Sequence, residues 1–246
     1  MNPDNQKITQ YFGRYHAAYL TSARHARGHD LDVLMDSLEL APHSRVLDAA
    51  CGTGHTTVAL AERGHTVSGL DLTSEMLGSA EKLAESRHVS VDWILGDVHQ
   101  LSWPDNTFDA VTCRRAAHHF HDLGLFLAEA TRVLKPGGRL GISDMTAPSP
   151  AIAGLNQLER FRDDSHYAAR TANEWAHLVA AQGLDLLTLT VQAEPMTPEE
   201  WLSPVSADST EGQDALRLLH SPTFPPGILL NGQFIKYRLI LVGVKN

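Results

Sequence analysis

Three aspartates follow apolar runs in the first half of the chain, spaced by about one strand and one helix. Asp48, Asp71 and Asp97 lie 23 and 26 residues apart. If the runs are parallel strands, their carboxyl ends meet at one edge of a sheet, which is where open α/β sheets bind ligands. Carboxylates there can accept hydrogen bonds from an ammonium group, ribose hydroxyls and an adenine amine. Each acid alone would be an ordinary loop residue, but together they predict a nucleoside site.

Glycines follow the first of these aspartates, in the segment Asp48-Ala49-Ala50-Cys51-Gly52-Thr53-Gly54. Glycine after a buried strand allows a sharp turn and a close approach of the backbone to a ligand. A dinucleotide-binding turn would have a third glycine where this chain has Thr57, and an acid before the turn would repel a pyrophosphate. The segment therefore favours S-adenosylmethionine (SAM) over NAD, although a plain strand-to-helix turn also carries such glycines.

Four segments within residues 45–145 resemble the class I SAM-dependent methyltransferases. They are VLDAACGTGHTT, VSGLDLTSEML, GDVHQLSWPDNTFDAVTCRRAAHHF and LKPGGRL. They look most like the branch that contains the ubiquinone and menaquinone C-methyltransferases and many small-molecule methyltransferases. The resemblance implies SAM as cofactor and a seventh, antiparallel strand. It also implies cofactor contacts at Asp48, Ala49, Gly52, Gly54, Asp71, Leu72, Met76, Asp97, Val98 and Arg114.

An aromatic-rich segment near the start of the chain is expected to form a helix over residues 6–20. Its aromatic side chains fall near one face at helical spacing. We expect this region to close over the cofactor, with Tyr19 and His25 reaching the cofactor's carboxylate. Simple packing of the helix on the core is the alternative.

Histidines cluster after the fourth expected strand, in the segment 116–121 (AAHHFH). An imidazole titrates near neutrality, so His118 and His119 are candidates for a catalytic base or a hydrogen bond to the substrate. Metal binding through His118 and His121 and ordinary buried histidines are the alternatives, and we expect no metal.

Two more substrate-binding candidates lie in the segment after the fifth expected strand. By the resemblance, this segment covers the acceptor pocket, and Arg162 and His166 would face that pocket. A surface helix with mixed charges is the alternative.

Apolar runs alternate with helical periodicity through the rest of the chain. We expect strands at 45–49, 66–70, 89–95, 108–113, 139–143, 184–191 and 234–244, and helices at 56–63, 74–86, 123–134 and 172–181. This alternation of strands and helices predicts an α/β fold, a Rossmann-like doubly wound sheet with helices on both faces. A single domain over 1–246 would include a helical cap over 1–40, a SAM-binding core over 45–145, and substrate-side insertions over 148–170 (helical) and 195–232 (loop-rich, with a turn at Asn231-Gly232).

Composition limits the partners and the compartment. The net charge is −9, which disfavours general binding to nucleic acid or to an anionic membrane. Two cysteines, no signal peptide and no bilayer-length apolar run predict a protein of the reducing cytoplasm. We expect a monomer or homodimer.

The leading hypothesis is methyl transfer from SAM to a small-molecule acceptor by in-line displacement. The alternatives are a SAM-binding sensor or non-methylating catalyst, and an NAD-dependent oxidoreductase. Methylation of protein or nucleic acid is disfavoured by the acidic charge and by the lack of an Asn-Pro-Pro-Tyr segment.

Overall fold

A mostly parallel sheet forms the centre of the computed structural model, which describes residues 3–21, 26, 28–203 and 205–246. Its strands are β1 (Arg45–Ala49), β2 (Thr66–Asp71), β3 (Asp92–Leu95), β4 (Phe108–Arg114), β5 (Leu134–Thr146), β6 (Leu184–Met196), β7 (Leu229–Leu230) and β8 (Gln233–Lys245). The order is β3-β2-β1-β4-β5-β8-β6, and β8 is antiparallel to both neighbours. The predicted seven-stranded sheet with an antiparallel last strand is confirmed, and β7 adds a two-residue strand beside β8.

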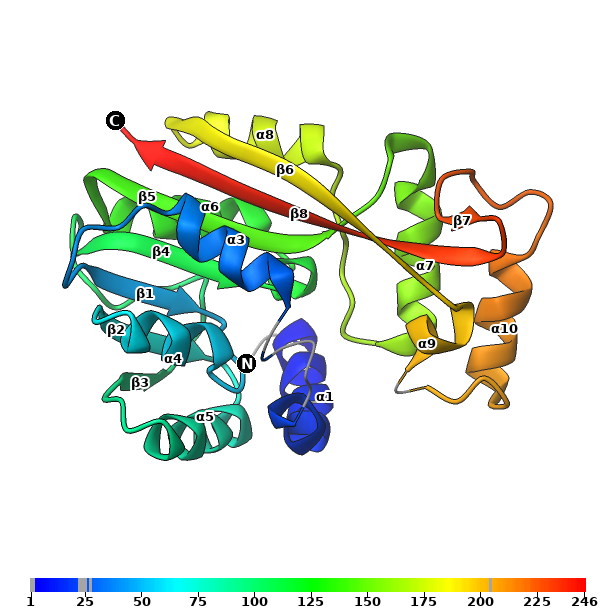
Figure 1. Cartoon of the computed structure of the whole chain (residues 1–246), viewed down its shortest axis with the longest axis horizontal. Helices are drawn as coiled ribbons and strands as arrows, with labels where there is room; N and C mark the ends of the chain where they lie inside the picture. Colours follow the sequence, from blue (N-terminus) through cyan, green and yellow to red (C-terminus); the bar gives the residue numbers. More distant parts are fainter. Residues whose placement is uncertain (1–2, 22–25, 27, 204) are drawn as a thin grey trace.

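Helices cover both faces of this sheet (Figure 1). They are α1 (Pro3–Leu20), α3 (His29–Ser37), α4 (His55–Glu62), α5 (Ser74–Ser86), α6 (Leu123–Val133), α7 (Ile152–Arg162), α8 (Ala172–Ala181), α9 (Pro198–Leu202) and α10 (Thr210–Leu219). One apolar cluster joins α3 and α4 to the sheet, and another joins α6 and α8 to its opposite face. Among the helices of the described residues, none combines the length and the apolar character needed to cross a membrane.

Helix α6 illustrates how the sequence produces this packing. Its buried side chains recur at helical spacing and face the sheet: Leu123, Phe126, Leu127, Ala130 and Val133. Asp122 caps the helix by accepting a hydrogen bond from the Leu125 N–H at 2.8 Å. Replacing the fully buried Phe126 by Ala would cost about 3–5 kcal/mol of folding stability.

Strands β6 and β8 continue beyond the rest of the sheet and carry a second lobe made of α7, α9, α10 and β7 (Figure 1). This lobe has its own apolar cluster, in which Trp201 stacks on Phe234 with ring centroids 4.6 Å apart. Residues from both expected insertions, 148–170 and 195–232, lie in it, and α7 packs on α10. The lobe is therefore tied to the core sheet by β6 and β8.

The loop-rich expectation for 195–232 holds only in part, because the segment also contains α9 and α10. Pro195 belongs to β6, an edge strand where a missing N–H does not break a ladder. Thr197 and Glu200 form a capping box that starts α9, and Ser209 caps α10. The turn at Asn231-Gly232 is confirmed, because both residues have positive φ and join Leu230 to Gln233.

Candidate active site

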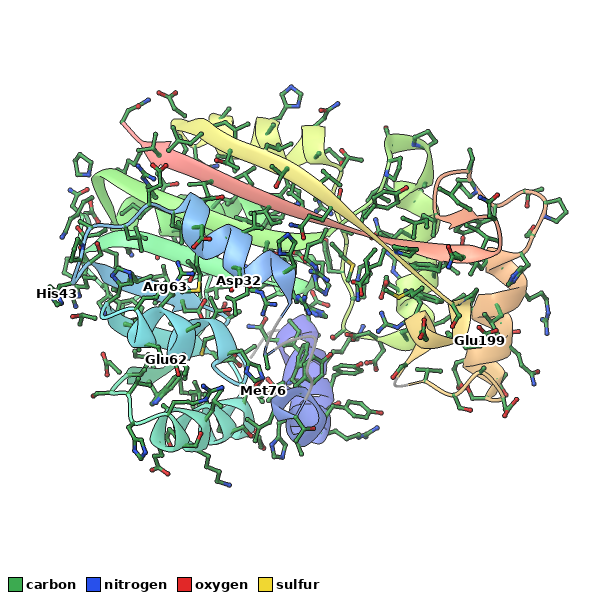
Figure 2. The ribbon with its side chains drawn as sticks, in the orientation of Figure 1. Asp32, His43, Glu62, Arg63, Met76 and Glu199 are labelled. Carbon is green, nitrogen blue, oxygen red and sulfur yellow. The ribbon has the colours of Figure 1, made fainter. Side chains whose placement is uncertain are left out.

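A cavity opens at the carboxyl ends of β1, β2 and β4, at the edge predicted from the three aspartates. We call it the strand-end cavity. Eight of the predicted cofactor contacts line it: Tyr19, Gly52, Asp71, Leu72, Met76, Asp97, Val98 and Arg114. Figure 2 shows Met76, at the start of α5, pointing toward α1. The described part of the chain holds no group of three His, Cys, Asp or Glu side chains placed to bind a metal ion.

The glycine-rich turn after β1 lies against Asp71. The Gly52 N–H donates to Asp71 Oδ2 at 2.8 Å, and the Thr73 N–H donates to Oδ1 at 2.9 Å. Gly54 does not line the cavity; its φ of 80° and its contact with α5 leave no room for a side chain, since a Cβ would lie 2.8 Å from that of Ala80. The turn is thus held in place by a carboxylate that also faces the cavity.

Asp48 lies beneath this turn and does not line the cavity. Its carboxylate accepts hydrogen bonds from the hydroxyls of Thr57 (2.6 Å) and Thr112 (2.8 Å), so it joins β1 to α4 and β4. Burial raises its pKa to about 6, against the opposing effect of those hydroxyls. Ala49, also fully buried, does not line the cavity either. Contrary to the prediction, the Asp48 carboxylate does not project into the cavity.

Asp71 and Asp97 differ in their surroundings, although both line the cavity. Burial raises the pKa of Asp71, while the N–H groups of Thr73 and Gly52 oppose that rise. The hydrogen bond from His99 Nδ1, at 2.6 Å, is the main cause of a pKa for Asp97 well below its usual range. Asn5 Nδ2 donates to the other Asp97 oxygen at 2.7 Å. Two carboxylates are therefore available to accept from hydroxyl or amine donors.

Helix α1 forms one wall of the strand-end cavity and packs on α5. Asn5, Ile8, Phe12 and Tyr19 all face the cavity from this helix. The sequence analysis anticipated an aromatic face here but missed Asn5 and Ile8, whose polar and aliphatic side chains gave no signal. His25 lies outside the described residues.

A second cavity, which we call the lobe cavity, lies between α1, α7 and β8. It shares four lining residues with the strand-end cavity: Phe12, Tyr19, Arg115 and His119. The predicted substrate residues His118, Arg162 and His166 also line it. The two cavities are therefore neighbours with a common wall.

His118 is held by a buried carboxylate that the sequence analysis missed. Its Nδ1 lies 2.5 Å from Asp144 Oδ1, and its backbone N–H donates to Oδ2 at 2.8 Å. Burial would raise the pKa of Asp144, but the charge and hydrogen bond of His118 outweigh it and hold the pKa below its usual value. The position of Asp144, just past the expected end of strand 139–143, was a signal of the same kind as the other strand-end acids.

His119 and His166 lie beside His118, with ring centroids 4.1 and 5.6 Å from its ring. His119 Nδ1 lies 3.1 Å from the Ser165 carbonyl oxygen. Burial and the neighbouring His118 lower the pKa of His119 to about 4, and the same causes lower that of His166 to about 3. Both rings are therefore neutral near pH 7.

Arg162 is engaged within the lobe. It pairs with the buried Glu159 at 2.5 Å, and its Nη2 donates to the Ser203 carbonyl oxygen at 3.0 Å. Glu159 accepts a further hydrogen bond from the Trp201 indole at 3.0 Å. The charge of Arg162 is thus largely balanced, although the side chain lines the lobe cavity.

Comparison with known proteins agrees with this arrangement. Residues 47–142 match a family model described as a methyltransferase domain. The uncharacterised methyltransferase YcgJ of Bacillus subtilis is 34% identical over 180 residues, which are 72% of this chain and 71% of that protein. The chain belongs to the class I SAM-dependent methyltransferases, and its cofactor is SAM.

A solved structure and a second relative differ in how much of the chain they cover. The crystal structure of YcgJ superposes with a TM-score of 0.80 at 28% identity, covering 89% of this methyltransferase and 98% of YcgJ. A demethylmenaquinone methyltransferase of Deinococcus radiodurans is 40% identical over 120 residues, 47% of this chain and 50% of that protein. The second likeness spans about half of each protein, so it says nothing of the acceptor side.

The residues of the strand-end cavity fit SAM. Asp71 and Asp97 present carboxylate oxygens for the ribose hydroxyls and the adenine amine, and Leu72 and Val98 present apolar surface for the ring. His99 also lines this cavity, and its buried Nε2 has no partner within the described part of the chain. A buried polar atom of this kind ordinarily has a hydrogen-bond partner, which a bound ligand can supply.

Proposed function

We propose that SAM binds in the strand-end cavity and that a small-molecule acceptor binds in the lobe cavity. The observation that carries this proposal is the common wall of Phe12, Tyr19, Arg115 and His119. A methyltransferase needs its two ligands in contact and shielded from water, because most of the rate enhancement comes from aligning them. Two neighbouring cavities closed by one helix suit that need.

SAM supplies an electrophilic methyl group when it is bound. The chain itself would align the acceptor and, where the acceptor carries a proton on the attacking atom, remove that proton. Asp71 and Asp97 hold the nucleoside, α1 covers it, and the aromatic side chains of Phe12 and Tyr19 exclude water from the wall between the cavities.

His118 is the best-placed base for that proton. Asp144 accepts from Nδ1, which fixes the tautomer with a proton on Nδ1 and leaves Nε2 as an acceptor. His118 lines the lobe cavity, so Nε2 can take a proton from an acceptor bound there. His119, whose Nδ1 faces the Ser165 carbonyl oxygen, would shape the pocket and hydrogen-bond the acceptor.

Two measurements test the proposal together. Calorimetry should show binding of SAM and S-adenosylhomocysteine and none of NAD, and a coupled assay against a panel of small molecules should show formation of S-adenosylhomocysteine that depends on the acceptor. Binding of NAD alone would overturn the cofactor assignment. Tight SAM binding with no acceptor in a broad panel, and no labelled methyl on protein or nucleic acid, would favour a non-methylating SAM-binding protein instead.

The remaining expectations from the sequence complete the proposal. The whole chain would act as one methyltransferase domain, with 1–40 as a helical cap, 148–170 and 195–232 on the acceptor side, and no nucleic-acid partner. A cytoplasmic location would suit such an enzyme, since Cys51 and Cys113 are both free thiols. We expect it to be a monomer or a homodimer.

A further inference from the structure

Positive side chains gather where the lobe cavity meets a groove beside α3. Arg115, Lys236 and Arg238 line both the cavity and the groove. Lys236 and Arg238 come from alternate positions of β8, so they stand on one face of that strand. Arg114, Arg115 and Arg238 surround one buried carboxylate, Asp30.

That carboxylate is already saturated by other donors. Asp30 accepts hydrogen bonds from Arg114 (2.8 and 3.0 Å), from Arg115 (2.6 and 3.1 Å) and from the Ser143 hydroxyl (2.9 Å). Arg238 Nε lies 3.9 Å from Asp30 Oδ2, beyond hydrogen-bond distance. Burial would raise the pKa of Asp30, but the three arginines hold it far below its usual range.

Arg238 and Lys236 are left without a full complement of partners. Arg238 is only 9% exposed, and its buried Nη1 has no hydrogen-bond partner among the residues that the structure describes. The Lys236 side chain makes no hydrogen bond or ion pair within the same residues. Burial and the charges of Arg238 and Arg162 lower the pKa of Lys236 to about 7. Charges that are partly or fully buried ordinarily have an opposite charge beside them.

The nearby acids are engaged by other donors, although the charge of Glu159 favours the protonated form of Lys236 and that of Asp144 favours the charged form of Arg238. Glu159 is paired with Arg162 and Trp201, and the carboxylate of Asp163 accepts from the Ser165 N–H at 2.9 Å. Glu200 caps α9 through the Thr197 N–H. Glu194 faces Lys236 across the β6–β8 register, but it is exposed and forms no ion pair with it.

We propose, on the basis of the function proposed above, that the methyl acceptor carries an oxyanion, a carboxylate or a phosphate, which binds between Lys236, Arg238 and Arg115. The rest of the acceptor lies against the aromatic side of the lobe cavity, formed by Tyr11, Phe12, Tyr15 and Tyr19. Because Arg115 also lines the strand-end cavity, an anion held there anchors the acceptor beside the cofactor.

The test uses three probes of similar size with the full chain saturated with S-adenosylhomocysteine: benzoate, phenyl phosphate and neutral benzamide. Calorimetry is run on the parent chain, Lys236→Met, Arg238→Met and a control, Arg217→Met, which removes an exposed cation from α10. Lys236 is only half-buried, so Lys236→Met keeps the test usable if Arg238→Met fails to fold. Binding of S-adenosylhomocysteine to each variant is measured separately, so that damage to the cofactor site is distinguished from loss of the anion site.

We expect at least one anionic probe to bind tenfold or more tightly than benzamide, and the one preferred identifies carboxylate or phosphate as the anion. Its Kd should rise at least tenfold in Lys236→Met and stay unchanged in Arg217→Met. At pH 8, binding to the parent should take up a proton, because a nearby anion raises the pKa of Lys236 back above the solution pH, and Lys236→Met should lose this uptake. Equal binding of benzamide and the anions, or anion binding unchanged in Lys236→Met, would overturn the proposal while S-adenosylhomocysteine binding stands.

Discussion

His118 and Asp144 face one another where β4 and β5 end, with the imidazole Nδ1 2.5 Å from the carboxylate Oδ1. The other oxygen of Asp144 accepts from the backbone N–H of His118, so one buried carboxylate fixes both the ring and the chain that carries it. This double attachment sets the direction of Nε2, and it is the reason for preferring His118 over His119 as the base.

Replacing His118 by Ala tests that preference. If His118 removes a proton from the acceptor, turnover should fall by roughly 10²–10⁴ while the Kd for S-adenosylhomocysteine stays unchanged. His119→Ala should instead raise the acceptor KM with a smaller effect on turnover. His177→Ala, on the exposed surface of α8, is the matched control. Full activity of both His118→Ala and His119→Ala would mean that the acceptor needs no base.

Asp71→Ala should weaken binding of S-adenosylhomocysteine by roughly 1.5–3 kcal/mol, the scale of hydrogen bonds to a charged group. The side chain is buried, so the substitution should also affect the stability of the fold. The N–H groups of Gly52 and Thr73 would lose their acceptor, and stability should fall by about 1–3 kcal/mol. Calorimetry and urea denaturation measure the two effects. Asp92→Asn, at the exposed start of β3, should change neither.

Asp48 should give the ligand-free protein a defined pH dependence. Its folded pKa of about 6 lies above the value of about 4 in an unfolded chain. Between pH 4 and 6 the unfolded state loses this proton while the folded state keeps it, so the free energy of unfolding falls by about 3 kcal/mol as pH rises. Asp48→Asn has no proton to lose in this range. Its free energy of unfolding, compared with that of the parent in urea denaturation, should therefore rise by about 3 kcal/mol between pH 4 and pH 7. A constant difference across this range would show that the carboxylate ionises normally.

Phe12 contributes to both cavities and contacts His119 edge to face, with ring centroids 5.0 Å apart. Phe12→Ala should therefore weaken S-adenosylhomocysteine binding by about 1 kcal/mol or more and raise the acceptor KM as well. Lys7→Ala, on the exposed side of the same helix, should affect neither. An effect confined to one ligand would argue against a common wall.

The sheet was predictable because its strands and helices alternate with clear apolar periods. The site was predictable where chemistry follows strand ends, as for Asp71 and Asp97, but strand position alone could not show that Asp48 turns inward to Thr57 and Thr112. That orientation depends on hydroxyls brought from α4 and β4 by the fold.

Other parts of the site depended on contacts between distant segments. Lys236 and Arg238 stood in an apolar strand at alternate positions, and this period was a usable signal that the sequence analysis passed over. Their importance becomes visible only when β8 lies beside Arg115 and Asp30, more than a hundred residues away in sequence. The long β6–β8 extension was missed because Pro195 suggests a loop unless the strand is known to be at an edge.

Helix α1 forms part of both cavities, and this has a consequence for the order of events in turnover. Any outward movement of α1 uncovers the strand-end cavity and removes one side of the lobe cavity at the same time. The pocket for the acceptor is therefore complete only while α1 also covers the cofactor, so both ligands must be in place before the helix closes. Exchange of spent cofactor and escape of methylated product would then depend on one shared opening, and a single rate would limit both.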